Sequence, residues 1–298
     1  MPLRRGQKTE RHDMTIQPKP VEFLHSAITL PEFNVFAIDF WGFGIRWYAL
    51  AYIAGLFIGI YILRRETRSP HTVMTVDQTD WLLNYLLVGI ILGGRFGYVF
   101  FYNTDYYLEN PLSILHVWQG GMSFHGALIG VGLALFTMAK RHNIAFLALS
   151  DRVAMVTPIG LFLGRLSNFI NGELFGRVTD VPWAMIFPHS DGLPRHPSQL
   201  YEAGLEGALL GLAMYLCWRR GWLKATGRLT GLFLFGYGLA RFFVELVRQP
   251  DAHIGLLAGG LSMGQILSLP MMLLGSYLLR HALRPSHDQS HDKGGDHE

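Results

Sequence analysis

The chain has 298 residues, of which 50% are hydrophobic and only 16% charged, and its formal net charge is +3. Soluble domains carry charge on about a quarter of their residues, so this composition excludes an ordinary soluble protein. The 34 glycines exceed the usual share of about 7%, as is common in membrane-spanning helices, and a single integral membrane domain is predicted.

The N-terminal segment is polar and basic. No apolar stretch of the kind that forms the centre of a signal peptide accompanies it, so a cleavable signal peptide is not expected. We interpret residues 1–25 as a polar tail, and Met14 as an alternative native start that would exclude residues 1–13. Residues 26–284 are predicted to form the transmembrane domain, and residues 285–298 a disordered polar tail.

Apolar runs recur along the transmembrane domain, each close to the ~20 residues that a helix needs to cross a bilayer. They predict an all-α integral membrane protein with about seven transmembrane helices and polar outer loops. The predicted spans are residues 44–63, 81–101, 123–139, 147–164, 199–218, 229–248 and 261–281.

Most basic residues outside the tail fall on alternate connections between the spans. They are Arg64, Arg65, Arg68, Lys140, Arg141, Arg219, Arg220, Lys224, Arg228, Arg280 and Arg284. Cytoplasmic loops carry an excess of Lys and Arg, so the N-terminus is predicted outside and the C-terminus in the cytoplasm. The basic N-terminal tail opposes this orientation, and opposes it less if the chain starts at Met14.

A second set of arginines lies in outer halves of spans or on outer loops, where the orientation rule gives no reason for them. They are Arg46, Arg95, Arg165, Arg177, Arg195, Arg241 and Arg248. Structural ion pairing is one interpretation, above all for Arg95 and Arg177. An outward-facing anion site is the favoured one, because the planar guanidinium fork suits phosphate.

The most informative segment is Gly164–Arg177, which follows an apolar run at the predicted end of a span. It contains two arginines, two asparagines and one glutamate. Charges beside hydrocarbon are costly, so a membrane protein that keeps them usually binds or converts something polar there. The segment therefore predicts an anionic headgroup held at one membrane face.

Span 229–248 carries four polar side chains on one helical stripe. Tyr237, Arg241, Glu245 and Arg248 follow one another at positions i, i+4, i+8 and i+11. Glu245, one turn from Arg241, is its predicted partner. A purely structural ion pair is the alternative, but such pairs often give little net stability, and function explains the pair better.

His125 lies within the glycine-rich segment Gly120–Gly126, at a predicted helix start near the outer face. It is either an interfacial residue or a general base for the arginine site. Cys217 is the only cysteine, so no internal disulfide and no cysteine-based zinc site can form. The sequence lacks a serine-hydrolase elbow, a P-loop and an HExxH motif, and no metal or cofactor is expected.

These motifs resemble those of the bacterial prolipoprotein diacylglyceryl transferases, over about residues 31–283. The diagnostic element is Gly164–Arg177. Supporting matches are Arg46–Tyr48, Gly93–Arg95, Gly120–Gly126, His196–Glu202, Tyr237–Arg241, Val244–Glu245, Arg248–Asp251 and Ser262–Gln265. The chain departs from the family pattern at Ser167 and Ala127, which replace glycines, and its segment between Phe187 and Arg195 is short.

The resemblance implies transfer of a diacylglyceryl group from phosphatidylglycerol to the lipobox cysteine of a preprolipoprotein, giving a thioether and glycerol 1-phosphate. Residues 26–284 would be the catalytic domain, in the bacterial inner membrane, with the site toward the periplasmic face. No nucleic acid is an expected partner.

The resemblance also suggests roles for single residues. Arg165 would bind the lipid phosphate, with Asn168 and Glu173 shaping that pocket. Arg241, held by Glu245, would stabilise the leaving phosphate, while Arg248 and Arg95 add to substrate binding. His125 would activate the thiol, and Tyr48 or Tyr237 would orient the headgroup. An arginine-stabilised thiolate without a dedicated base stays open.

Two other functions explain the buried arginines. A transporter or flippase of an anionic lipid or solute would also need a polar path, but such proteins often carry internal repeats, and none is visible here. A non-catalytic lipid-binding scaffold would leave His125 without a purpose.

Overall fold

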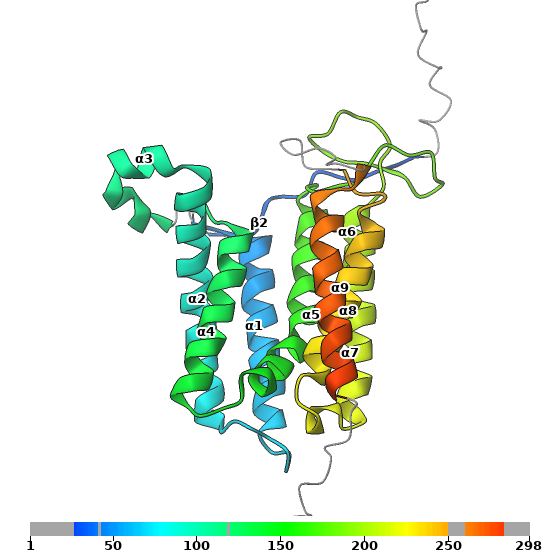
Figure 1. Ribbon diagram of the computed structural model, residues 1–298. Coiled ribbons are helices and arrows are strands. Elements are labelled where there is room, and N and C mark those ends of the chain that lie inside the picture. The colour runs from blue at the N-terminus through cyan, green and yellow to red at the C-terminus, as the bar shows by residue number, and fades with distance from the viewer. Residues whose placement is uncertain (1–26, 41–42, 118–119, 250–259, 283–298) are drawn as a thin grey trace, which may run out of the picture.

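The computed structural model describes residues 27–40, 43–117, 120–249 and 260–282. The predicted tails, residues 1–25 and 285–298, lie outside these residues, as does Met14. Long helices stand side by side (Figure 1), and one of them overlaps each predicted span. They are α1 (Trp47–Glu66), α2 (Val76–Tyr102), α4 (Phe124–Arg141), α5 (Phe146–Ile170), α8 (Arg228–Val244), α9 (Met263–Ala282), and a continuous rod of α6 (Ser198–Glu202), the π-helix η4 (Ala203–Leu209) and α7 (Leu210–Arg219).

Within the described residues, four of these helices are long and apolar enough to cross a membrane, by length and composition. They are Trp47–Glu66, Val76–Tyr102, Phe146–Ile170 and the rod Ser198–Arg219. α8 has 17 residues and is shorter than the usual span. The protein is therefore a mostly helical membrane protein, and the predicted number of seven crossings stays a prediction.

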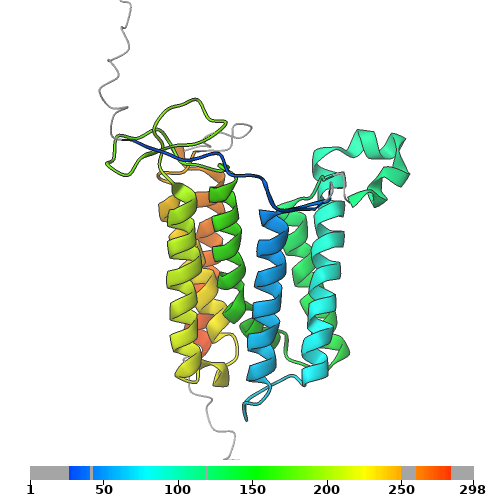
Figure 2. The same ribbon diagram turned by 180° about the vertical axis from the view of Figure 1, so that it is seen from behind.

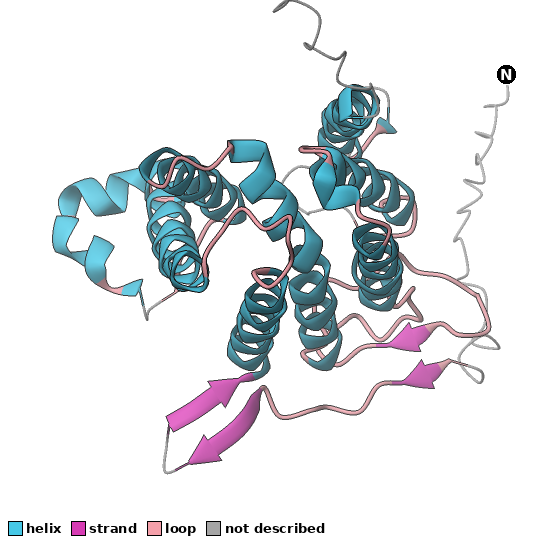
Figure 3. Cartoon of the chain, turned by 90° about the horizontal axis from the view of Figure 1, so that it is seen from below, coloured by secondary structure: helices cyan, strands magenta, loops and turns pink. Residues whose placement is uncertain are grey.

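The fold is mostly helical, as predicted, and short strands lie in its outer loops. β1 (Ile28–Thr29) pairs in parallel with β4 (Met185–Ile186), and β2 (Phe36–Phe40) pairs antiparallel with β3 (Phe43–Arg46). Figure 3 shows both pairs beside the helices. Two short helices, α3 (Thr104–Glu109) and the 3-10 helix η2 (Pro111–Leu115), follow α2, and another 3-10 helix, η5 (Trp222–Lys224), precedes α8. The strands β1 to β4 are too short to give an alternating pattern in the sequence.

The helices form two groups, with α1 between α2 and α5 in both side views (Figures 1 and 2). α2 packs on α4, while α5 to α9 form the larger group and α1 packs mainly on α5. Leu63 near the end of α1, Met138 near the end of α4 and Leu149 near the start of α5 are almost completely buried. These ends of the helices lie at the lower end of Figure 1. That end also carries the basic helix ends, including Arg64, Lys140 and Arg219.

Glycines let α2 and α4 approach each other closely. Gly89, Gly93 and Gly97 recur every fourth residue on α2 and face Gly126 and Gly130 of α4. A Cβ on Gly130 would lie 3.0 Å from the Cα of Gly93 and closer still to the Gly89 carbonyl. Small residues at such spacing are a known means of close helix packing in membranes.

We expect Gly130→Leu to destabilise the protein, because the larger side chain must push the backbones of α2 and α4 apart. Overpacking typically costs about 1–3 kcal/mol, and a backbone contact leaves little room for relaxation. The midpoint of thermal unfolding in detergent should fall. Gly132→Leu is the matched control, because a Cβ at Gly132 meets nothing within 4 Å. Equal stability of the two variants would show that the contact does not matter.

Candidate functional site

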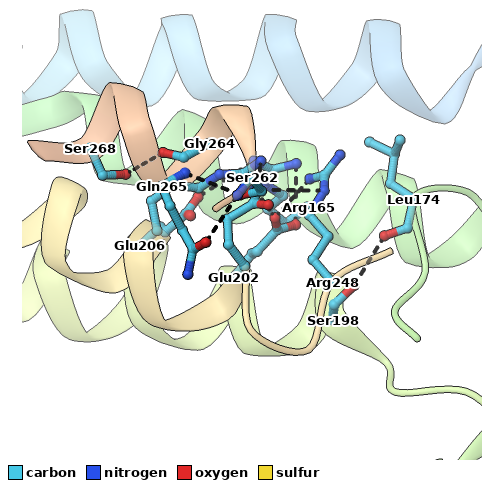
Figure 4. A network of polar contacts seen from close by, with 12 residues as sticks. Arg165, Leu174, Ser198, Glu202, Glu206, Arg248, Ser262, Gly264, Gln265 and Ser268 are labelled. Carbon is cyan, nitrogen blue, oxygen red and sulfur yellow. Dashed lines mark hydrogen bonds and ion pairs between the residues drawn. The ribbon is translucent and has the colours of Figure 1, made fainter. Parts of the chain in front are cut away.

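Six charged side chains meet at the upper ends of α5 and α8, beside the start of the α6–α7 rod. We call this set the arginine–glutamate cluster; its members are Arg165, Glu202, Glu206, Arg241, Glu245 and Arg248. Figure 4 shows Arg165 and Arg248 directed toward Glu202, with Glu206 beside them. Each comes from a segment of mainly apolar sequence, where a charged residue is costly without partners.

Glu202 lies at the centre of the cluster and is fully buried. Its Oε2 lies 3.2 Å from Nη1 of Arg165. Its Oε1 lies 2.5 Å from Nη1 of Arg241 and 2.9 Å from Nη1 of Arg248. One carboxylate therefore gathers three guanidinium groups from two helices and the turn that follows α8.

The other two carboxylates of the cluster pair with the same arginines. Oε2 of Glu206 lies 3.5 Å from Nη2 of Arg165. Glu245 pairs with Arg241, as the helical spacing predicted, so that pairing is confirmed. Gly264, in the first turn of α9, allows the close approach, since a Cβ there would lie 2.6 Å from the Glu245 carboxyl carbon.

The helix ends that carry these arginines differ from the predicted ones. α5 continues to Ile170, six residues beyond the predicted end at 164, so Arg165 and Asn168 lie within the helix. α8 ends at Val244 rather than 248, yet the backbone N–H of Arg248 still donates to the Val244 carbonyl at 2.9 Å. The extension of α5 has a physical reason, since Arg165 and Asn168 find polar partners there and the helix can continue past the apolar run.

A second polar group surrounds Tyr48 at the start of α1. The Tyr48 hydroxyl donates to Oε2 of Glu173 at 3.4 Å and accepts a hydrogen bond from the Asn168 amide. The positive charge of Arg165 interacts with the hydroxyl groups of both Tyr48 and Tyr237, the latter on α8. Tyr48, Asn168, Glu173 and Tyr237 thus lie around the arginine–glutamate cluster.

The loop between α5 and α6 closes over the upper end of α8. The Arg177 backbone N–H donates to the Val247 carbonyl at 2.8 Å, and its Nε donates to the Arg248 carbonyl at 3.0 Å. Arg195 donates to the Gly176 carbonyl at 3.1 Å and also pairs with Asp191. The hydrogen bonds from Arg195 to the Asp191 carboxylate lower the pKa of Asp191. Arg177 and Arg195 therefore hold the loop rather than join the cluster.

His196 ties the same loop to α6. The Tyr201 hydroxyl accepts from the Trp183 indole at 2.6 Å and lies 3.2 Å from Nδ1 of His196. Burial lowers the pKa of His196 and so favours the neutral ring that can accept the Tyr201 proton. This arrangement agrees with a role for His196 in ordering its loop.

The α2–α4 pair carries the two remaining predicted site residues. Arg95 is buried, and its guanidinium donates to the carbonyls of Ser113, Ile114, His116, Gly120 and Gly121, at 2.6 to 3.3 Å. His125 is exposed in the first turn of α4, whose start is capped by the Ser123 hydroxyl. Neither residue belongs to the arginine–glutamate cluster, although α4 begins at the same upper end of the molecule (Figure 1).

Sequence reasoning did not single out the two central carboxylates. Glu202 falls within the His196–Glu202 match, which gives it no role of its own, and Glu206 lies outside all of the matches. Their signal was present in the sequence: two glutamates four residues apart in an otherwise apolar helix share one face. An acidic residue within a membrane span is by itself a sign of a functional site.

Comparisons with known proteins agree with one another. A family model described as prolipoprotein diacylglyceryl transferase matches residues 35–281. A relative from Paramagnetospirillum magneticum is 51% identical over 260 residues, covering 87% of this chain and 97% of its own. A relative from Methylocella silvestris is 52% identical, covering 80% of this chain and 90% of its own. A relative from Roseobacter denitrificans is 48% identical, covering 87% of this chain and 99% of its own. All three are named phosphatidylglycerol–prolipoprotein diacylglyceryl transferase.

Proposed function

Because the chain belongs to the prolipoprotein diacylglyceryl transferase family, we propose that the arginine–glutamate cluster is the site of its reaction. The protein is a transferase that moves a diacylglyceryl group from phosphatidylglycerol to a prolipoprotein. This function replaces the alternatives of a transporter or a lipid-binding scaffold. The observation that supports the site is the convergence of three guanidinium groups on one fully buried carboxylate.

The chemistry requires positive charge more than it requires a nucleophile from the enzyme. The thiol of the lipobox cysteine attacks the carbon of the diacylglyceryl group that bears the phosphate. A C–S bond forms there, and the bond from that carbon to the phosphate oxygen breaks. The thiol loses its proton, and glycerol 1-phosphate departs with additional negative charge. Fixed donors aimed at that developing charge lower the barrier strongly in a site that excludes water.

The contacts of each residue support the role that we propose for it. Arg165 binds the lipid phosphate beside Asn168 and Glu173. Its shortest carboxylate contact, at 3.2 Å, is longer than the shortest contacts of Arg241 and Arg248. Arg241, held by Glu202 and Glu245, stabilises the leaving phosphate, and Arg248 adds to substrate binding.

The remaining roles fall to the aromatic hydroxyls and to the α2–α4 pair. Tyr48 or Tyr237 orients the headgroup, and His125 accepts the thiol proton. Arg95 contributes to substrate binding indirectly, because it donates hydrogen bonds to the carbonyls of Gly120 and Gly121 in the segment before His125.

The decisive experiment combines purified protein, phosphatidylglycerol and a synthetic lipobox peptide, with the peptide followed by mass spectrometry. We expect a gain in mass equal to one diacylglyceryl group. The adduct should survive neutral hydroxylamine, which cleaves thioesters but not thioethers. Loss of the lipid under that treatment would show acyl transfer and contradict attack at carbon.

We further propose seven crossings, an outside N-terminus and a cytoplasmic C-terminus in the bacterial inner membrane. The gathering of basic helix ends at the lower end of the bundle supports this orientation. Reporter fusions at Arg141, Lys224 and the C-terminus should report a cytoplasmic position, and a fusion at Asp191 an external one. A cytoplasmic signal at Asp191 would place the cluster on the wrong face for exported substrates.

A further inference from the structure

The arginine–glutamate cluster is balanced in charge. Its three guanidinium groups face three carboxylates, and each arginine already pairs with at least one of them. A lipid phosphate brings one more negative charge into this buried set. It can gain an arginine only in competition with a carboxylate, and a buried carboxylate that loses its partner is strongly disfavoured.

Glu206 is the carboxylate that the cluster holds least firmly. It pairs with a single arginine, at 3.5 Å, whereas Glu202 pairs with three and Glu245 with two. Oε1 of Glu206 is buried and has no hydrogen-bond partner among the described residues. The phosphate therefore competes most easily with Glu206, and the arginine it gains is Arg165.

Glu206 cannot simply move away into water. Its side chain has no exposed surface, and the next residue, Gly207, packs so tightly on α5 that a Cβ would lie 2.8 Å from the Cα of Phe162. The seven-residue π-helix η4 carries both residues, and π-helical turns are frequent at functional sites.

Four charged or titratable groups act on Glu206 from the elements packed around it. They are Arg165 from α5, Glu202 from α6, and Arg241 and Tyr237 from α8. α7 also packs on η4, but none of its titratable side chains is among them. When Arg165 turns to a phosphate, Glu206 loses the arginine with which it pairs, while Arg241 is already paired with Glu202 and Glu245. The charge of Glu206 then stands beside that of Glu202 without a paired arginine of its own.

We propose that Glu206 takes up one proton when phosphatidylglycerol binds, so that Arg165 passes from the Glu206 carboxylate to the lipid phosphate. The proton comes from water and converts the carboxylate to a neutral acid. The phosphate replaces the lost negative charge, and the net charge of the occupied cluster is unchanged. This inference rests on the proposed function, which assigns the lipid phosphate to this cluster.

The test is calorimetric titration of the full chain in detergent with phosphatidylglycerol, in two buffers of different ionisation enthalpy. The wild-type protein should take up about one proton per lipid, so its affinity should fall by up to about tenfold per pH unit as the pH rises. Glu206→Gln, whose amide imitates the protonated acid, should bind without proton uptake and with little dependence on pH.

Glu66→Gln is the matched control, because Glu66 is an equally buried glutamate paired with Arg152 in another part of the fold. It should keep the uptake of one proton, and phosphatidylcholine should cause none. Binding of phosphatidylglycerol by the wild type without proton uptake would overturn the inference, whatever the folding of the variants. The same preparation is assayed for transfer: transfer without uptake rejects only the role of Glu206, while absence of both binding and transfer rejects the proposed function.

Discussion

Arg241→Lys is expected to lower the single-turnover rate by about 10²–10³-fold, with a much smaller change in affinity for phosphatidylglycerol. In the structure the two terminal nitrogens of Arg241 contact different carboxylates, Glu202 and Glu245. The planar fork keeps further N–H groups for phosphate oxygens, whereas lysine offers one point charge on a flexible stem. Because charge on the phosphate grows only during transfer, the loss should appear in the rate.

The measurement compares rate and affinity for Arg241→Lys and Arg241→Gln in protein shown to be folded. Arg64→Lys is the matched control, because Arg64 forms an exposed ion pair with Asp80 at the opposite end of the bundle. That variant should stay within a few-fold of the wild type. Near-normal turnover with lysine at position 241 would mean that Arg241 supplies charge alone and that Arg165 carries the leaving group.

His125→Asn should lower transfer by about 10²–10⁴-fold, the usual contribution of a general base, while leaving lipid binding close to normal. Asparagine keeps a polar side chain in the first turn of α4 but cannot accept the thiol proton. His125 lies outside the arginine–glutamate cluster, so the arginines that bind the phosphate should be unaffected.

The experiment records transfer and binding from neutral to mildly acidic pH. His142→Asn, at the other end of the same helix, is the matched control and should behave like the wild type. Activity of the His125 variant within a few-fold of the wild type across that range would reject the base and favour a thiolate stabilised by arginine.

The sequence predicted the positions of the long helices and the partnership of Arg241 with Glu245. Both depend on short-range rules: an apolar run of suitable length becomes a helix, and residues four apart on it touch. The boundaries were less accurate, because α5 runs on through Arg165 to Ile170. Hydropathy marks where lipid begins, and a helix supported by neighbouring polar side chains can continue past that point.

The contacts of Arg95 and the position of Glu202 could not be predicted. The five carbonyls around Arg95 come from a loop whose path no local pattern specifies. The sequence marks Glu202 as an acidic residue in an apolar helix, but its partners depend on the long-range arrangement that brings the ends of α5 and α8 together beside it. The strands of the outer loops are too short to show an alternating pattern in the sequence.

Asp151, near the lower end of α5, has a consequence for the two arginines far above it. Its carboxylate accepts hydrogen bonds from the backbone N–H groups of Gly227, at 2.6 Å, and Thr230, at 2.7 Å, and so joins the start of α8 to α5. Arg165 lies 14 residues after Asp151, and Arg241 lies 14 residues after Gly227. Each arginine is therefore about 21 Å along its helix from these hydrogen bonds. The Asp151 hydrogen bonds therefore set the two helices in register, so that Arg165 and Arg241 reach the same height in the bundle and can share Glu202.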